Sequence, residues 1–266
     1  MARIVAAKGL LTSSRPRNFG ALSNTAQNAP LLNIVHEDDQ LLALNKPADL
    51  VCHPTKTDAW SSLIGRVRLH LGETATAHMI NRLDRETSGL VLIAKTDDFA
   101  RAVRKLWESR EVLKEYQAIV HGWPVEDHGV VEAALGKDET SPVAIKDCVR
   151  LDGAASRTEF ATERRFERAD GKFALLKVTP RTGRKHQIRI HLAHVGHPIV
   201  GDKLYGHDED CYLALVEGRL TDEQRARLIL RNHALHAGRL QFTLEGEPFE
   251  FTAEPEPAFL DFCRAF

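Results

Sequence analysis

The sequence lacks any run of about 18 apolar residues, which excludes a conventional membrane-spanning helix. It also lacks a charge excess, because 36 Lys and Arg residues against 37 Asp and Glu residues leave a formal net charge of −1. Binding of nucleic acid must therefore rest on local clusters of basic residues and not on overall charge. Hydrophobic residues make up 43% of the chain, which is close to the globular average and allows a sizeable core.

Patterns that bind metals or nucleotide cofactors are missing as well. The cysteines are far apart and form no C-x-x-C pair, as is typical of free thiols in a reducing compartment: Cys52, Cys148, Cys211 and Cys263. The sequence contains neither a P-loop nor a GxGxxG motif. His191 and His194 are three residues apart, but no nearby carboxylate completes a usual ligand set. We therefore predict no metal and no cofactor.

The first 30 residues differ in composition from the rest. Residues 1–30 contain no Asp or Glu but several basic residues, and they predict a flexible basic arm of a cytoplasmic protein. A mitochondrial transit peptide is the alternative, although Pro16 interrupts the weak helical pattern. Residues 31–266 show no internal linker and predict a single domain. Within it, residues 207–232 form a polar insertion that carries a helical capping box at Thr221 and Gln224.

Hydrophobic periodicity predicts helices and strands in a mixed order. Helical spacing indicates helices at 58–71, 96–112, 185–195 and 256–266. Strand-length runs separated by turn residues indicate strands at 34–35, 41–44, 90–94, 116–121, 130–135, 144–151, 157–166, 173–180, 235–242 and 249–252. Several strands in succession favour an antiparallel sheet over βαβ units. In the helix predicted over 185–195, the spacing places Lys185, Arg189 and Leu192 on one face.

The stretch from Asn81 to Lys95 joins a charged loop to a buried strand. Its first half carries Asp84 among other charged residues, and its second half is the apolar run 90–94. This order places Asp84 at the mouth of a core. Two interpretations remain open on these residues alone: a surface loop whose Asp pairs with an Arg, or a functional carboxylate.

A second stretch concentrates base without acid. Residues 181–191 contain four cationic residues and no Asp or Glu: Arg181, Arg184, Lys185 and Arg189. Thr182 and Gly183 precede the predicted helix, so backbone N–H groups and positive charge meet at its entrance. This combination predicts an anion-binding segment.

Together the two stretches resemble the RluA-type pseudouridine synthases. Residues 81–90 are similar to that family's H-R-L-D-x-x-T-S-G-L, and residues 181–206 to its R-T-G-R-x-H-Q-I-R-x-H-L…G-H-P-I-x-G-D-x-x-Y-G. Shorter pieces follow in family order at 45–47, 114–118 and 235–237, so that the resemblance spans about 34–251. The sequence departs from the pattern at Asn81, where the family usually has His.

The resemblance implies an α+β pseudouridine-synthase domain, with a mixed, largely antiparallel sheet, flanking helices and a central cleft. It implies an enzyme that isomerises uridine to pseudouridine in structured rRNA or tRNA after the target base has flipped out. Asp84 corresponds to the catalytic carboxylate, Arg189 to the arginine that pairs with it, and Tyr116 to the tyrosine that stacks on the base. The expected partner is RNA, with no membrane and no DNA, and the expected state is a monomer.

The same resemblance implies which residues bind RNA. Arg82 corresponds to the residue that enters the RNA as the uridine leaves the stack. The expected phosphate contacts are Arg181, Arg184, Lys185 and His186, and Lys46 is expected near the cleft. Two other classes of function stay open: an RNA-binding protein without activity, and a hydrolase in which Glu86 is a second carboxylate near Asp84.

Overall fold

The structure is a computed structural model that describes residues 30–54, 61–206 and 209–264. Its contacts divide the chain into residues 1–31 and residues 32–266. Nearly all of the arm predicted at residues 1–30 lies outside the described residues, as does Asp58 at the start of the first predicted helix. The description below concerns the second unit.

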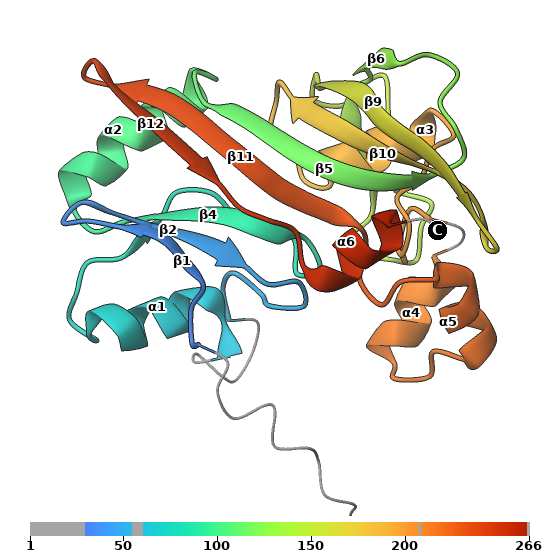
Figure 1. Ribbon diagram of the computed structural model, residues 1–266, viewed down its shortest axis with the longest axis horizontal. Coiled ribbons are helices and arrows are strands. Elements are labelled where there is room, and N and C mark those ends of the chain that lie inside the picture. Colours follow the sequence, from blue (N-terminus) through green and yellow to red (C-terminus); the bar gives the residue numbers. More distant parts are fainter. Residues whose placement is uncertain (1–29, 55–60, 207–208, 265–266) are drawn as a thin grey trace, which may run out of the picture. The chain divides into compact units, whose positions relative to one another are not determined.

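Ten strands in the described part of the chain form one mixed sheet, in the order β1-β2-β4-β11-β5-β10-β9-β6 with β3 beside β4 and β12 beside β11 (Figure 1). These strands are β1 (Ile34–Glu37), β2 (Leu41–Lys46), β3 (His78–Met79), β4 (Ser88–Ala94), β5 (Leu113–His121), β6 (His128–Glu132), β9 (Arg157–Arg168), β10 (Gly171–Pro180), β11 (Leu235–Leu244) and β12 (Glu247–Thr252). A small hairpin consists of β7 (Leu135–Lys137) and β8 (Asp147–Val149). All neighbours in the large sheet are antiparallel except β4 and β11. The α+β class predicted from the sequence is confirmed.

The helices lie near their predicted positions, with two differences, and one predicted strand is shorter than expected. They are α1 (Leu63–Leu71), α2 (Asp97–Glu108), α3 (Gln187–His194), α4 (Asp210–Val216), α5 (Asp222–Leu228) and α6 (Pro257–Cys263). The polar insertion holds two helices instead of one, and the capping box at Thr221 is present. The predicted strand 144–151 shrinks to the three residues of β8. Helix α3 begins later than predicted, because His186 has a left-handed φ of 55°. No described helix is long and apolar enough to cross a membrane.

Strand β4 is buried on both faces, which explains its uninterrupted apolar sequence. Val91 and Ile93 pack against α1 on one face. Leu90 and Leu92 pack against α2, β11 and β12 on the other face. Figure 1 shows the two helices on opposite sides of the β2–β4 pair. The alternation of side chains along a strand thus fixes β4 between two helices and holds its first residue in place.

Gly89 lies where β4 meets β11. The parallel pairing is limited to Ser88 with His236 and Gly89 with Ala237. Gly89 has a φ of +114°, and a Cβ there would lie 2.3 Å from the Ala237 carbonyl oxygen. Only glycine allows both the conformation and the close approach. The charged loop before β4 therefore ends at a rigid junction in the middle of the sheet.

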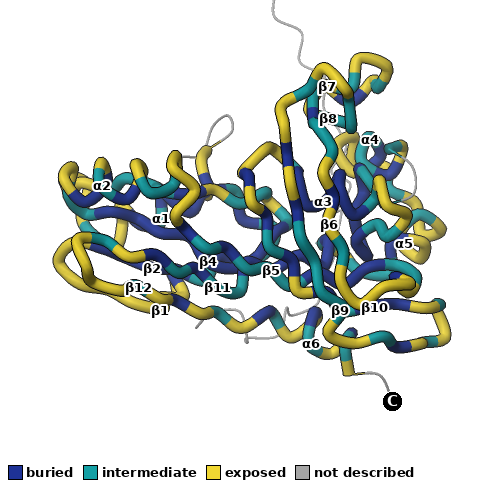
Figure 2. The backbone as a smooth tube through the Cα atoms, turned by 90° about the horizontal axis from the view of Figure 1, so that it is seen from above, coloured by how far each residue is buried: buried dark blue, intermediate teal, exposed yellow. Residues whose placement is uncertain are grey.

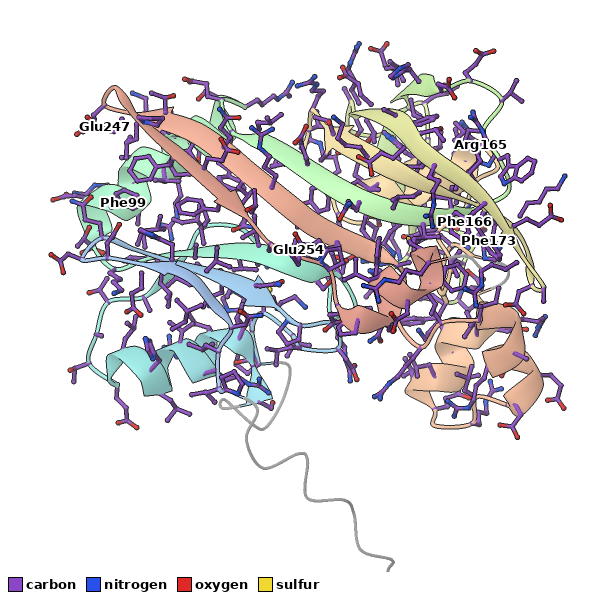
Figure 3. The ribbon with its side chains drawn as sticks, viewed as in Figure 1. Phe99, Arg165, Phe166, Phe173, Glu247 and Glu254 are labelled. Atoms are coloured by element: carbon purple, nitrogen blue, oxygen red, sulfur yellow. The ribbon has the colours of Figure 1, made fainter. Side chains whose placement is uncertain are left out.

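A separate hydrophobic cluster supports the other half of the sheet. It joins β5 and β10 to helices α3 and α6. Phe166 and Phe173 pack with Phe262 of α6, with ring centroids 5.0 to 6.1 Å apart (Figure 3). Figure 2 shows the buried segments of β4, β5 and α3 along the middle of this unit. Through this cluster α3 is held beside the loop that precedes β4.

Candidate active site

The loop between β3 and β4 is attached to the sheet by Asn81. Its buried side chain donates from Nδ2 to the Leu90 carbonyl at 3.0 Å and accepts from the Leu92 N–H at 2.9 Å. An amide can both donate and accept, so it matches a strand backbone with two hydrogen bonds. The one departure from the resembled pattern is thus a residue that positions the loop containing Asp84.

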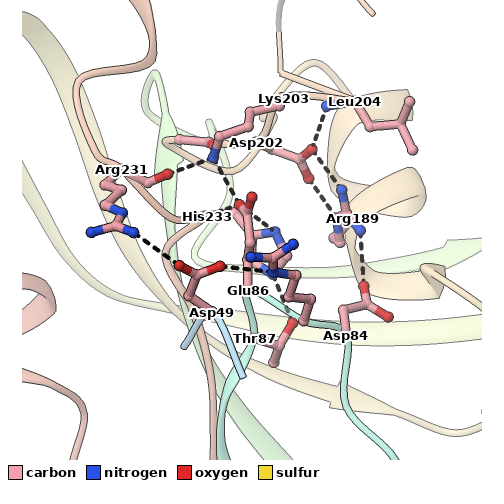
Figure 4. Close-up of polar contacts among 12 residues, drawn as sticks. Asp49, Asp84, Glu86, Thr87, Arg189, Asp202, Lys203, Leu204, Arg231 and His233 are labelled. Carbon is pink, nitrogen blue, oxygen red and sulfur yellow. Dashed lines mark hydrogen bonds and ion pairs between the residues drawn. The ribbon is translucent and has the colours of Figure 1, made fainter. Parts of the chain in front are cut away.

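Asp84 contacts the guanidinium of Arg189 (Figure 4). Its Oδ2 accepts from Arg189 Nη1 at 2.8 Å. The Asp84 side chain is 30% exposed, whereas that of Arg189 is 9% exposed. The carboxylate is therefore partly open to solvent, while the guanidinium that it contacts is buried. This arrangement confirms the predicted pairing of the two residues.

Asp202 holds Arg189 from the opposite side. Its two carboxylate oxygens accept from Arg189 Nε at 2.7 Å and Nη2 at 2.8 Å (Figure 4). The backbone N–H groups of Leu204 and Tyr205 also donate to Asp202. A bidentate contact fixes the guanidinium plane and leaves Nη1 for Asp84. Asp202 lies in the G-D-x-x-Y-G segment, but its position in the sequence does not reveal this contact.

Arg189 keeps Asp84 ionised. Burial is the largest single influence and would raise the pKa of Asp84, but the charge of Arg189, the smaller electrostatic effects of His186 and His233 and the Arg189 hydrogen bond together lower it. His186 Nε2 lies 3.8 Å from Asp84 Oδ2. Burial lowers the pKa of His186 to about 4 and that of His233 to about 3, so both rings are neutral at pH 7. Arg189 is therefore the cation that balances Asp84 at neutral pH.

Tyr116 lies across the sheet from this loop. It pairs with Ala237 of β11, which in turn pairs with Gly89, so the three residues are in register across adjacent strands. Burial and the negative charge of Asp84 raise the pKa of Tyr116, so its phenol is protonated. Its hydroxyl makes no hydrogen bond to a described residue. Tyr116 is thus a neutral, half-buried ring that lies close enough to Asp84 for that negative charge to affect its pKa.

His186 and Tyr205 contact each other beside the Asp84–Arg189 pair. His186 Nδ1 lies 2.9 Å from the Tyr205 hydroxyl, which accepts from the Asp147 N–H at 3.2 Å. The Arg189 guanidinium carbon lies 5.0 Å from the centre of the Tyr205 ring. The left-handed turn at His186 directs its ring toward Asp84 instead of continuing the helix.

The predicted RNA-binding cations divide into free and paired groups. Arg82 and Arg184 are exposed, and their side chains have no partner among the described residues. Arg181 donates to Glu159 at 2.6 Å, and Lys185 lies 3.0 Å from Asp147. Lys185 also precedes α3, so the predicted face shared with Arg189 and Leu192 is wrong.

Lys46 is buried and engaged by backbone carbonyls. Its side chain is fully buried, and its ammonium donates to the carbonyl oxygens of Pro47, Leu50 and Arg85 at 2.8 to 3.1 Å. Burial lowers its pKa to about 8, and Asp84 is near enough to affect that pKa. These contacts disfavour the expected binding of RNA by Lys46. Through the Arg85 carbonyl it supports the loop that contains Asp84.

Glu86 is engaged elsewhere and does not face Asp84 as a catalytic partner. It accepts from Lys203 Nζ at 2.9 Å and from the His233 N–H at 3.2 Å (Figure 4). The next residue, Thr87, has its hydroxyl 2.7 Å from His233 Nε2. These contacts anchor the end of the loop. They disfavour the paired-carboxylate arrangement on which the hydrolase interpretation depended.

His191 of α3 makes structural contacts. His191 is buried, with Nδ1 2.8 Å from the Thr158 hydroxyl and Nε2 3.0 Å from the Ala133 carbonyl. Within the part of the chain that the structure describes, no three His, Cys, Asp or Glu residues are grouped to hold a metal ion.

Comparisons with known proteins show which family this chain is similar to. A family model described as RNA pseudouridylate synthase matches residues 40–194. The chain is 31% identical over 240 residues to "Ribosomal large subunit pseudouridine synthase D" of Zymomonas mobilis, covering 87% of this chain and 71% of that protein. It is 33% identical over 187 residues to an "Uncharacterized RNA pseudouridine synthase" of Aquifex aeolicus, covering 68% of this chain and 57% of that protein.

Solved structures share the fold. That of "Human RNA Pseudouridylate Synthase Domain Containing 4" has a TM-score of 0.64 and 26% identity, covering 86% of this chain and 90% of that one. That of "Human RNA Pseudouridylate Synthase Domain Containing 1" has a TM-score of 0.68 and 24% identity, covering 88% and 89%.

Proposed function

The chain belongs to the family of RNA pseudouridylate synthases, and from this premise we propose that it isomerises uridine to pseudouridine in ribosomal RNA with Asp84 as the catalytic carboxylate. The resemblance to the RluA-type enzymes is confirmed by relatives at 31 to 33% identity. The choice of ribosomal RNA is supported by the name of the Zymomonas mobilis relative. A tRNA stem-loop is the other outcome that the experiment below can return.

The observation that carries the proposal is the chain of contacts from Asp202 through Arg189 to Asp84. A carboxylate that acts on a nucleoside must stay ionised while a substrate displaces its water. The fixed guanidinium supports this, because its charge remains beside Asp84 when the cleft closes on a base.

The reaction breaks the bond between N1 of uracil and the anomeric carbon of ribose and forms a bond from C5 to the same carbon. N1 gains a proton and C5 loses one, so atoms and charge balance without a redox agent. Asp84 can attack the anomeric carbon, attack the base ring, or promote the loss of a sugar proton. Each route requires the ionised carboxylate to lie beside the nucleoside.

Tyr116 is the proposed wall for the target base. Its neutral ring offers a face for stacking, and its free hydroxyl can bind or transfer a proton at the base. The site takes a single nucleotide that has left its helix. Extruding that nucleotide costs a few kcal/mol, which phosphate contacts must offset. The exposed Arg82, two residues before Asp84, is the proposed residue that fills the vacated space.

The experiment is a pseudouridine map of total RNA from cells with and without the gene. Carbodiimide-dependent stops in reverse transcription report each modified position. We expect one or more ribosomal sites to disappear on deletion, to return with the wild-type gene and to stay absent with Asp84→Asn. Loss of tRNA sites alone would change the substrate and keep the activity. If deletion leaves the map unchanged even in cells from which the other pseudouridine synthases have also been removed, the proposal is contradicted.

A further inference from the structure

A pocket of about 200 Å³ lies where the loop after α2 enters β5 and where β10 ends. Three of its lining residues are cations, namely Arg110, Lys114 and Arg181, and one is an acid, Glu111. They come from two segments, the loop that leads from α2 into β5 and the end of β10, and β5 and β10 are neighbours in the sheet (Figure 1). The pocket is separate from the contacts that hold Asp84.

Lys114 is unusual among the buried lysines. Its side chain belongs to a residue that is only 8% exposed, yet its ammonium has no hydrogen bond or ion pair with any described residue. Its one recorded contact is with the Trp107 ring, whose centre is 5.9 Å away. By contrast, Lys46 and Lys203 each donate to three oxygens. The side chain of Lys114 is nearly buried, but its ammonium is not one of the buried atoms without a partner and reaches the pocket, where solvent or a bound anion can accept its hydrogen bonds.

The charges around Lys114 also favour a bound anion. Burial lowers the pKa of Lys114, and the positive charges of Arg110 and Arg181 lower it further. Arg110 is exposed and without a side-chain partner in the described chain, whereas Arg181 binds Glu159. The acid of the pocket, Glu111, accepts from the hydroxyl of Ser109. Positive charge therefore exceeds negative charge in the pocket.

The pocket and Tyr116 lie along the same strand, β5. Lys114 and Tyr116 are two residues apart on β5, so their side chains leave the same face of the strand about 7 Å apart. Arg181 begins the segment that leads to His186 and Arg189. A strand of RNA whose target base lies against Tyr116 has backbone phosphates within this distance range.

We propose that this pocket binds a backbone phosphate of the substrate RNA beside the target nucleotide, with Lys114 as its central donor. The identity of the ligand as RNA rests on the proposed function, while the anion site rests on the pocket itself. A phosphodiester carries one negative charge and two free oxygens, so it supplies the acceptors that the Lys114 ammonium lacks.

Binding of a fluorescein-labelled decauridylate at several salt concentrations tests the pocket without requiring turnover. For Lys114→Gln we expect the Kd to rise about tenfold and the slope of log Kd against log salt to fall by about 0.7, as for one lost phosphate contact on a single strand. Lys114→Arg should bind nearly as the wild type does. Arg110→Gln, a change at the exposed rim, should weaken binding in the same direction.

Lys177→Gln is the matched control, because the substitution removes the same charge. Lys177 lies on β10, next to β5, and on the face of the sheet opposite Lys114. An equal loss of affinity in Lys177→Gln would reduce the effect to overall charge and overturn the proposal. An unchanged Kd and salt slope in Lys114→Gln would overturn it as well.

Thermal unfolding separates a binding role from a structural one. Because the Lys114 ammonium has no partner among the described residues, Lys114→Gln should have a Tm equal to or above that of the wild type. A lowered Tm with unchanged affinity per folded molecule would assign Lys114 to the core. A wild type that binds decauridylate through Lys114 but forms no pseudouridine would sink the proposed function and leave the pocket standing.

Discussion

The inner charges around Asp84 and the exposed cations at the rim of the site behave in opposite ways. Among the inner charges, Asp84, Arg189 and Asp202 form one chain of hydrogen bonds, and Glu86 pairs with Lys203. At the rim, Arg82 and Arg184 are exposed and have no partner among the described residues. The same residue type therefore fixes geometry where it is buried and remains available for phosphate where it is exposed.

The difference follows from the cost of burying charge. A buried ion that loses its partner costs several kcal/mol, so the inner contacts must all be made in the folded state. An exposed ion pair contributes at most about 1 kcal/mol, so the rim loses little stability by leaving its cations unpaired. We expect inner substitutions to change turnover and stability, and rim substitutions to change RNA affinity alone.

The largest effect among these substitutions is expected for Arg189→Lys. An ammonium cannot bind both oxygens of Asp202 and still donate to Asp84 in the same plane, so we expect single-turnover conversion to fall about a hundredfold. Arg231→Lys is the control, since Arg231 is exposed and pairs only with Asp49. Wild-type conversion by Arg189→Lys would show that the bidentate contact is dispensable.

A smaller loss is expected for Asp202→Asn. The amide keeps one acceptor for Arg189 but loses the charge and one of the two contacts, so the guanidinium is less well oriented toward Asp84. We expect the maximal rate of conversion to fall about tenfold, with little change in RNA affinity. Asp152→Asn breaks the same bidentate geometry with Arg150 at an exposed position and should be neutral. Equal effects of the two changes would remove the distinction between inner and outer charges.

Acid should destabilise the inner region through its neutral histidines. His233 has an ordinary pKa of 6.5 when unfolded and about 3 when folded, so its contribution is complete above pH 6.5 and is lost as pH falls toward 3. Between pH 7 and pH 5 this linkage amounts to about 2 kcal/mol. In urea unfolding at pH 7 and pH 5, the free energy of unfolding should fall less in His233→Gln than in the wild type, by about 2 kcal/mol. The exposed His128→Gln serves as control, and an identical pH dependence in both variants would contradict the assignment.

The smallest effects are expected at the rim. Arg82→Ala and Arg184→Ala should each raise the Kd for RNA a few-fold at low salt, and the difference should shrink as salt screens the contact. Neither change should lower the Tm, since neither side chain has a partner in the described chain. A rim variant that unfolds more readily while binding RNA normally would reverse the comparison.

The parts of the fold that the sequence predicted correctly are those governed by local pattern. The apolar run of β4 and the helical spacing of α2 reflect burial against neighbours, and both elements are present. The Thr221 capping box is satisfied by residues three positions apart. The pairing of Asp84 with Arg189 was available only through the family motifs, because 105 residues separate them.

The parts that the sequence could not predict depend on distant backbone groups. Lys46 resembles a polar residue at a turn, but the carbonyl of Arg85 and two others converge on it only once the sheet has formed. The helix predicted from residue 185 starts only after His186, whose φ of 55° is left-handed. The ring of His186 contacts Tyr205, a distant residue that helical spacing does not reveal. Asp202 acquires its role only when α3 brings Arg189 beside it.

The central claim is that Asp84 performs the chemistry while the surrounding charges only hold it. The most direct test mixes purified wild type or Asp84→Asn with RNA from cells that lack the gene, and follows both pseudouridine formation and RNA binding under single-turnover conditions. If Asp84 is the catalytic carboxylate, we expect full conversion by the wild type, none by Asp84→Asn and similar RNA affinity for both. Conversion by Asp84→Asn at the wild-type rate would contradict it and transfer the chemistry to another residue of the cleft.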